Sequence, residues 1–204
     1  MTTDVRIAGV GMTAFAKPGA HPPYPDMAAA AVHAALADAG LAYTDMQQAY
    51  VGYVYGDSTA GQRALYGVGM SGIPIFNVNN NCATGSTALF LARQAVASGM
   101  ADCVLALGFE HMNPGALGAV FTDRPSPFDP FDAATAELVG RSDIPLALRY
   151  FGGAGLAHMQ QYGTPLHTFA AIRAKASRHA ANNPLALLRK PLTTEDVMAA
   201  PMLW

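Results

Sequence analysis

The chain has 204 residues, of which 51% are hydrophobic and 13% are charged, enough to bury a sizeable core. The formal net charge is −2, so the composition gives no support to a nucleic-acid-binding function. Two cysteines, Cys82 and Cys103, stand too far apart for a metal motif or a disulfide framework, so we expect no bound metal. No stretch is typical of a membrane span or a targeting signal, and a cytoplasmic protein is therefore expected.

The first expected strand covers residues 5–10, where the sequence is mostly apolar. Gly9 to Ala14 also matches the dinucleotide-binding pattern G-x-G-x-x-A, which requires a helix to begin in that turn. We reject that reading because a run of prolines follows, and the next helix is expected only from Asp26, as its N-cap, to Gly40. The prolines are Pro18, Pro22, Pro23 and Pro25.

The next part of the chain alternates between strand and helix patterns. We expect strands over residues 49–55, 73–78 and 103–107, a short helix over residues 62–70, and a longer helix from Cys82 to Ser98 with Gly99 at its end. This alternation predicts an α/β fold with a mostly parallel sheet and helices on both faces. After Glu110, prolines and glycines interrupt regular structure, and helical spacing returns beyond Ile144. Thr193 to Asp196 is typical of a helix start.

Cys82 lies where an expected buried strand ends and a helix begins. Free N–H groups and the dipole at a helix N-terminus favour negative charge, so a thiol at this place is a candidate nucleophile. The small residues that follow leave room for a substrate, and the backbone N–H of Cys82 is a candidate oxyanion donor. The alternative is a buried structural cysteine.

Three asparagines, Asn79 to Asn81, directly precede Cys82. Asparagine is depleted in strands, and buried amides need hydrogen-bond partners. The run therefore indicates either a structured polar site or a strand edge that pairs at a subunit interface.

Four segments resemble a known family. Residues 79–110, NNNCATGSTALFLARQAVASGMADCVLALGFE, resemble the nucleophile segment of the thiolases, most closely the branch of sterol carrier protein X and the lipid-transfer proteins. Residues 49–74, AYVGYVYGDSTAGQRALYGVGMSGIP, resemble the same branch. So do residues 151–164, FGGAGLAHMQQYGT, and the tripeptide NNP at residues 182–184. The likeness covers nearly the whole chain.

The resemblance implies a thiolase-like N-terminal half plus a loop domain. Residues 1–110 would form the α/β domain, residues 111–185 the loop domain that covers acyl-CoA, and residues 186–204 a return toward the α/β domain. His158 would line the substrate pocket, although Ala157 stands where this branch usually has glutamate.

The implied function is acyl transfer between CoA thioesters, with Cys82 as the acyl-accepting nucleophile, in the breakdown or synthesis of 3-ketoacyl-CoA. CoA and acyl-CoA would be substrates, and no metal or other cofactor is implied. Two alternatives stay open. A cysteine hydrolase would pair Cys82 with a histidine of this chain and release acid without CoA. A non-catalytic lipid-binding or acyl-CoA-binding relative would keep the pocket and lack turnover.

Thiolases contain two similar halves, and the second supplies a histidine that activates the nucleophile and a second cysteine. Neither has a counterpart in this sequence, so we expect an N-terminal portion that lacks a C-terminal half and that has little or no thiolase activity and marginal solubility alone. In thiolases the strand before the nucleophile pairs with its twin across a two-fold axis. We therefore expect a homodimer through Phe76 to Asn81.

Overall fold

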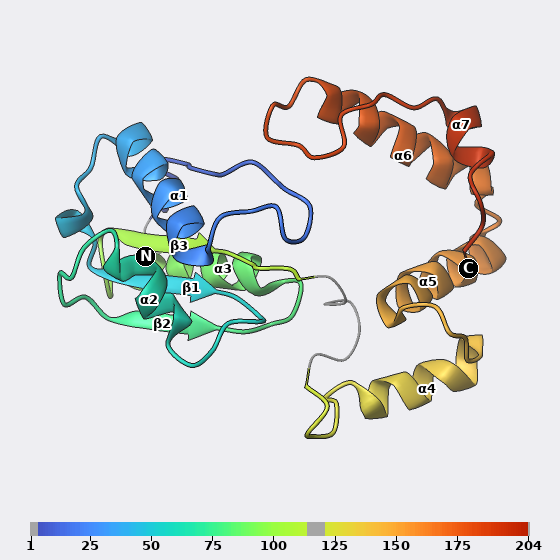
Figure 1. Ribbon diagram of the computed structural model, residues 1–204, viewed down its shortest axis with the longest axis horizontal. Helices are drawn as coiled ribbons and strands as arrows, with labels where there is room; N and C mark the ends of the chain where they lie inside the picture. The colour runs from blue at the N-terminus through green and yellow to red at the C-terminus, as the bar shows by residue number, and fades with distance from the viewer. Residues whose placement is uncertain (1–3, 114–120, 204) are drawn as a thin grey trace. The chain divides into compact units, whose positions relative to one another are not determined.

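The computed structural model describes residues 4–113 and 121–203. The chain divides into two compact units, residues 1–112 and 113–204 (Figure 1). The first is an α/β unit that contains Cys82, and the second is built from helices. Pro114, Gly115 and Gly118, which were expected to interrupt regular structure, lie outside the described residues.

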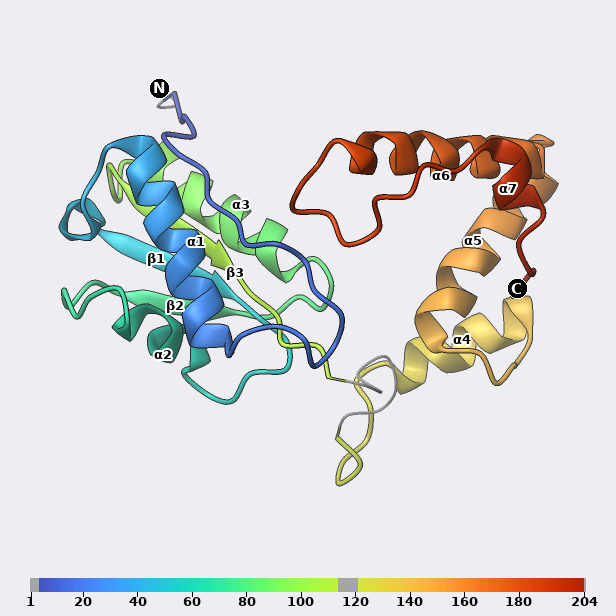
Figure 2. The same ribbon diagram turned by 45° about the horizontal axis from the view of Figure 1, so that its top comes forward.

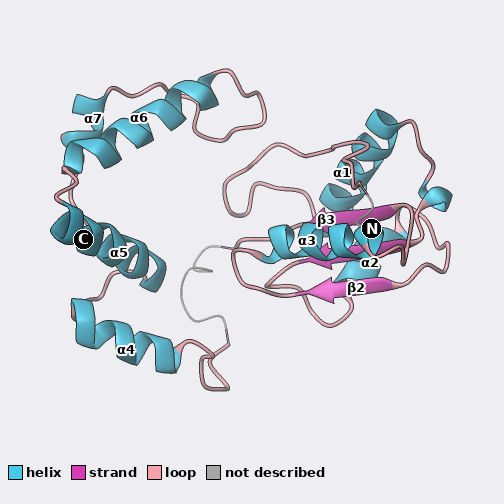
Figure 3. Cartoon of the chain, turned by 180° about the vertical axis from the view of Figure 1, so that it is seen from behind, coloured by secondary structure: helices cyan, strands magenta, loops and turns pink. Residues whose placement is uncertain are grey.

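A parallel sheet forms the centre of the first unit. Its strands are β1 (Gln48–Gly52), β2 (Ile75–Val78) and β3 (Val104–Gly108), in the order β2-β1-β3. Figure 3 shows all three running in the same direction. Gly52 pairs with Val78 on one side and with Gly108 on the other, so the three strands end level with one another. The expected α/β fold with a parallel sheet is confirmed.

Helices cover both faces of this sheet, as expected. α1 (Tyr24–Ala39) and α2 (Ala60–Tyr66) lie on one face and α3 (Thr84–Ala97) on the other (Figure 2). Successive strand residues point to opposite faces, so Val51 and Leu107 enter the core shared with α1 and α2, whereas Gly52 meets α3. A 3-10 turn, η1 (Tyr43–Asp45), connects α1 to β1.

Glycines end two of the helices as the sequence predicts. Gly40 caps α1 in the left-handed conformation, with φ of 65°, and Gly99 follows α3 with φ of 74°. Asp26 is not the N-cap of α1, because the helix begins at Tyr24 with Pro23 in that position. Pro25 lies in the first turn of α1, where its ring fixes a helical φ. The helix therefore begins before Asp26.

The expected strand over residues 5–10 is wrong. The structure assigns no strand there, and the side chains of Ile7 and Val10 are 65% and 67% exposed. The segment instead packs on α1 through Gly9 and Gly11, where an added Cβ would lie 2.4 Å and 2.1 Å from backbone oxygens of the helix. Glycine allows this close approach of backbone to helix, and the apolar side chains of Ile7 and Val10 stay outside the sheet.

The second unit contains four helices within its described residues. They are α4 (Asp129–Val139), α5 (Leu146–Tyr162), α6 (Leu166–Ala181) and α7 (Thr194–Met198). α7 begins at the expected helix start, with a capping box in which Asp196 N–H donates to Thr193 Oγ1 and Thr193 N–H donates to Asp196 Oδ2. The buried Arg149 of α5 pairs with Asp132 of α4. Within the described ranges, no helix is both long and apolar enough to cross a membrane.

Candidate functional site

The turn between β2 and α3 holds Cys82 and is organised by its polar neighbours. Asn81 adopts a left-handed conformation, with φ of 46°, which asparagine tolerates better than most residues. Asn79 Oδ1 accepts from the Asn81 N–H at 3.2 Å, and Thr84 Oγ1 accepts from the Asn80 N–H at 3.0 Å. The asparagine run therefore forms a structured polar turn that sets the path of the chain through Cys82.

Glycines let the start of α3 lie directly on the sheet. A Cβ on Gly52 would lie 2.7 Å from the Thr84 carbonyl oxygen, and a Cβ on Gly108 would lie 3.3 Å from the Gly85 Cα. The first turn of α3 thus rests on the last residues of β1 and β3. Cys82, two residues before this helix, is held at the carboxyl edge of the sheet, where open α/β sheets commonly bind ligands.

The Cys82 side chain is exposed to solvent. Its thiol forms no hydrogen bond with any residue that the structure describes. The 14-residue α3 begins just after it, so the positive end of a helix dipole lies beside the thiol. The predicted strand, turn and helix around Cys82 are confirmed, but the strand is not buried, because β2 lies at the edge of the sheet and its Phe76 is 44% exposed. The role of Cys82 as nucleophile stays a prediction.

Glu110 and Tyr55 also lie at this edge, and the sequence reasoning did not select them. Glu110 follows the end of β3, and its carboxylate accepts from the N–H groups of Val54 at 2.9 Å and Tyr55 at 3.3 Å. Burial, and then the negative charges of Glu110 and Cys82, raise the pKa of Tyr55. One signal was available, because polar residues that follow parallel strands gather at the same sheet edge.

Cys103 lies at the other end of the sheet. It precedes β3, and its Sγ is 3.8 Å from the sulfur of Met46. Burial raises the pKa of the Cys103 thiol, and the negative charge of Asp45 raises it further by a smaller amount. A raised pKa leaves less thiolate at neutral pH, so Cys103 is a poor nucleophile as well as a distant one.

We predict that iodoacetamide alkylates Cys82 well before Cys103 at pH 7. The exposed thiol meets the reagent freely, whereas Cys103 is half-buried and has a raised pKa. Peptide mass spectrometry after brief treatment measures both rates, and the Cys103 rate should gain on the Cys82 rate as the pH rises. Equal labelling of the folded protein at pH 7 would contradict the difference.

His111, which follows the carboxyl end of β3, packs on His21. The rings of His21 and His111 lie 4.2 Å apart, edge to face, and His21 Nε2 lies 3.3 Å from the Met112 carbonyl oxygen. His158 lies in the second unit, exposed on α5, where its ring is 4.8 Å from that of Tyr162. Its place in a substrate pocket stays a prediction.

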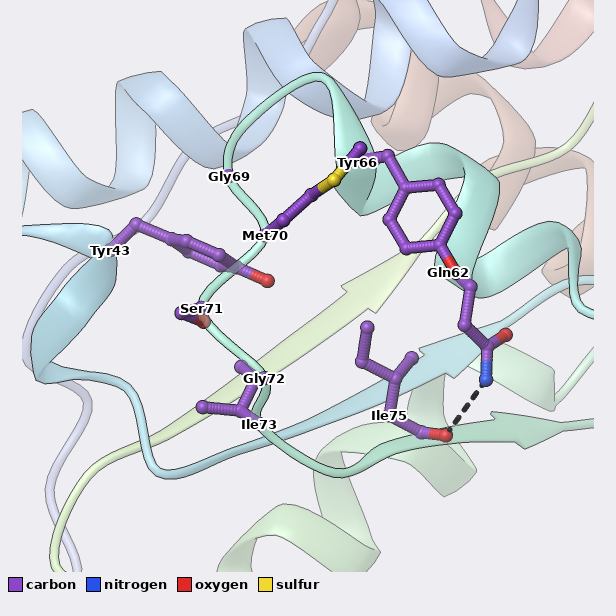
Figure 4. Close-up of a pocket in the computed structure, with 9 residues that line it drawn as sticks. All are labelled: Tyr43, Gln62, Tyr66, Gly69, Met70, Ser71, Gly72, Ile73 and Ile75. Atoms are coloured by element: carbon purple, nitrogen blue, oxygen red, sulfur yellow. Dashed lines mark hydrogen bonds between the residues drawn. The ribbon is translucent and has the colours of Figure 1, made fainter.

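A cavity of about 500 Å³ lies at the amino end of β2, away from Cys82 (Figure 4). Gln62 and Tyr66 of α2 lie on one side of it and Tyr43 on the other, and Gln62 Nε2 donates to the Ile75 carbonyl oxygen at 3.2 Å. The lining residues that the structure describes carry no charge at neutral pH. β2 lies between this cavity and the Cys82 turn, so the cavity is not a substrate pocket for the Cys82 thiol.

Comparison with known proteins gives a consistent result. The family model described as the thiolase N-terminal domain matches residues 5–119. Sterol carrier protein 2 of Homo sapiens is 52% identical over 199 residues, which cover 96% of this chain and 36% of that protein. The benzoylsuccinyl-CoA thiolase subunit BbsB of Thauera aromatica is 34% identical over 198 residues, which cover 95% of this chain and 48% of that protein.

A solved structure described as an Ltp2-ChsH2(DUF35) aldolase shares the fold. It superposes with a TM-score of 0.72 and 22% identity over 97% of this chain and 49% of its own. The chain thus spans 36% of the human relative and about half of the other two proteins. Because the matched family model covers more than half of the 204 residues and includes nearly the whole unit around Cys82, the chain belongs to the thiolase family.

Proposed function

We propose that this chain takes part in acyl transfer between CoA thioesters, with Cys82 as the residue that accepts the acyl group. The observation that carries the proposal is an exposed cysteine in an ordered turn at the carboxyl edge of a parallel sheet, directly before a helix N-terminus. The thiolase family membership and the CoA thioester in the name of the Thauera relative support the same chemistry.

In the proposed reaction the Cys82 thiolate attacks the carbonyl carbon of an acyl-CoA. A bond forms between Sγ and that carbon, the bond to the CoA sulfur breaks, and the CoA thiolate leaves and takes up a proton. In thiolysis of a 3-ketoacyl-CoA, Cys82 instead attacks the 3-keto carbon, and the broken bond joins carbons 2 and 3. The acetyl-CoA carbanion that leaves must be protonated, and a second CoA then removes the acyl group from Cys82.

Cys103 does not transfer protons in the proposed reaction, because it lies at the opposite end of the sheet from Cys82. The rings of His21 and His111 pack on each other. We therefore propose that the described unit supplies the nucleophile and the helix N-terminus, and that full turnover draws its acid and base from outside residues 4–112. His158 is proposed to contact acyl-CoA in the assembled protein.

A non-catalytic carrier is the second candidate, because the human relative is named a sterol carrier protein. Incubation with a radiolabelled acyl-CoA separates the candidates. Label held on the protein and released as acyl-CoA by added CoA supports transfer. Label released as free acid without CoA indicates a hydrolase, and reversible binding without a covalent adduct indicates a carrier.

We also propose a homodimer through β2, because this strand lies at an edge of the three-stranded sheet and Phe76 is 44% exposed there. Phe76→Lys should convert the dimer to a monomer, since two lysines facing each other across a two-fold axis repel. Light scattering at micromolar concentration measures the mass, with Phe15→Lys, also at an exposed phenylalanine, as the control. A monomer in the unsubstituted protein would contradict the proposal.

A further inference from the structure

Glu110 continues the connection between β1 and β3 beyond the point where the strands stop pairing. The last backbone bond between them runs from the Phe109 N–H to the Gly52 carbonyl oxygen at 3.1 Å. Past this point the amides of Val54 and Tyr55 both donate to the Glu110 carboxylate. The Glu110 side chain thus accepts hydrogen bonds from backbone amides that follow β1, as the carbonyl groups of a neighbouring strand would.

Both carboxylate oxygens of Glu110 are used. Oε2 accepts from Val54, and Oε1 accepts from Tyr55 and from the N–H of His111 at 3.1 Å. Hydrogen bonds to a charged acceptor are stronger than those to a neutral one. The half-buried carboxylate therefore fastens the loop after β1 to the loop after β3.

The fastened loop lies at the same sheet edge as Cys82. Val54 is two residues beyond Gly52, Glu110 is two residues beyond Gly108, and Cys82 is two residues before Thr84. Gly52 contacts Thr84, and Gly108 contacts Gly85. Val54, Glu110 and Cys82 thus each lie within two residues of the place where β1 and β3 contact the first turn of α3.

Tyr55 is coupled to both acidic groups. The charges of Glu110 and Cys82 raise its pKa in addition to the larger effect of burial. A raised pKa keeps the phenol protonated at neutral pH.

We propose that Glu110 is a positioning residue for Cys82, which acts by holding the loop of Val54 and Tyr55 in place as a wall of the acyl-accepting site. This inference rests on the proposed acyl transfer for its effect on rate. The placement of the loop itself depends only on the hydrogen bonds of Glu110.

The test compares Glu110→Gln with Asp38→Asn. Asp38 also accepts a hydrogen bond from a backbone amide of the same unit, the N–H of Val10 at 2.9 Å, but it lies on α1. Glutamine has one acceptor oxygen, so at least one amide bound by Glu110 loses its partner. Glu110→Asp, which keeps the charge on a shorter side chain, provides a second variant if the glutamine variant fails to fold.

Three measured quantities are expected to change in Glu110→Gln and not in Asp38→Asn. Amide hydrogen exchange at Val54 and Tyr55 should quicken about tenfold or more, the size of effect expected for an amide that loses a charged acceptor. The pKa of Tyr55, from ultraviolet titration against Tyr55→Phe, should fall because a neighbouring negative charge is removed. Acylation of Cys82 by acyl-CoA should slow by about 10-fold to 100-fold through lost positioning, while alkylation by iodoacetamide changes less than about threefold.

Unchanged amide exchange at Val54 and Tyr55 in both Glu110 variants, together with an unchanged Tyr55 titration in Glu110→Gln, would overturn the placement of the loop. A loosened loop with unchanged acylation would overturn its role in positioning. Absence of acylation in the unsubstituted protein would refute the proposed function, and the exchange and titration results would then decide whether Glu110 places Tyr55.

Discussion

Replacing Cys82 with serine is expected to abolish the transfer of an acyl group from acyl-CoA to the protein. A serine hydroxyl is almost fully protonated at neutral pH, and without an adjacent base it is a far weaker nucleophile than a thiolate. The loss should amount to about three orders of magnitude or more in rate, the scale seen when catalytic nucleophiles are removed. Intact-mass spectrometry after incubation with acyl-CoA measures the adduct directly.

Cys103→Ser provides the matched control, because it removes the other thiol at the opposite end of the sheet. It should leave the acylation rate nearly unchanged. The Cys82 variant should unfold within about 0.5 kcal/mol of the unsubstituted protein, since the exposed side chain makes no described hydrogen bond. A Cys82→Ser protein that still acquires the acyl group on the same peptide at a similar rate would contradict the assignment.

Gly52→Ala is expected to lower the free energy of unfolding and to displace the Cys82 turn. The added Cβ would lie 2.7 Å from the Thr84 Cγ2 and carbonyl oxygen, so the first turn of α3 must move. Overpacking of this kind costs about 1–3 kcal/mol. Urea titration followed by circular dichroism measures the change.

Gly67→Ala is the control for this substitution. Gly67 ends α2 with φ of −71°, and an added Cβ there meets no atom within 4 Å. An alanine at such a position is expected to stabilise the protein slightly, by about 0.4–1 kcal/mol, because it restricts the unfolded chain. The two substitutions should thus act with opposite signs. Equal and small effects would show that α3 does not rest on the sheet as described.

The local pattern around Cys82 could be predicted because each part has its own signal. The apolar run of β2, the asparagines of the turn and Gly99 after α3 all indicate the same strand, turn and helix. Where local signals agree, the fold follows from short stretches of sequence.

The N-terminal segment and Glu110 show where this reasoning stops. Residues 5–10 carry a strand-like composition, but Gly9 and the following Gly11 favour packing on α1, which depends on the tertiary structure. The only signal of Glu110 was its place after an expected parallel strand, and its partners could not be predicted because Val54 and Tyr55 are 56 and 55 residues away along the chain. Only the parallel sheet brings these loops to one edge.

The measurement that tests the central claim most directly is the location of the acyl group after incubation with an acyl-CoA and no free CoA. The protein is digested at mildly acidic pH, at which thioesters survive, and its peptides are sequenced by mass spectrometry. We predict one acylated peptide, with the added mass on Cys82, and loss of that mass when CoA is then supplied. An adduct on Cys103, or no covalent adduct, would contradict the assignment of Cys82 as the acyl-accepting nucleophile.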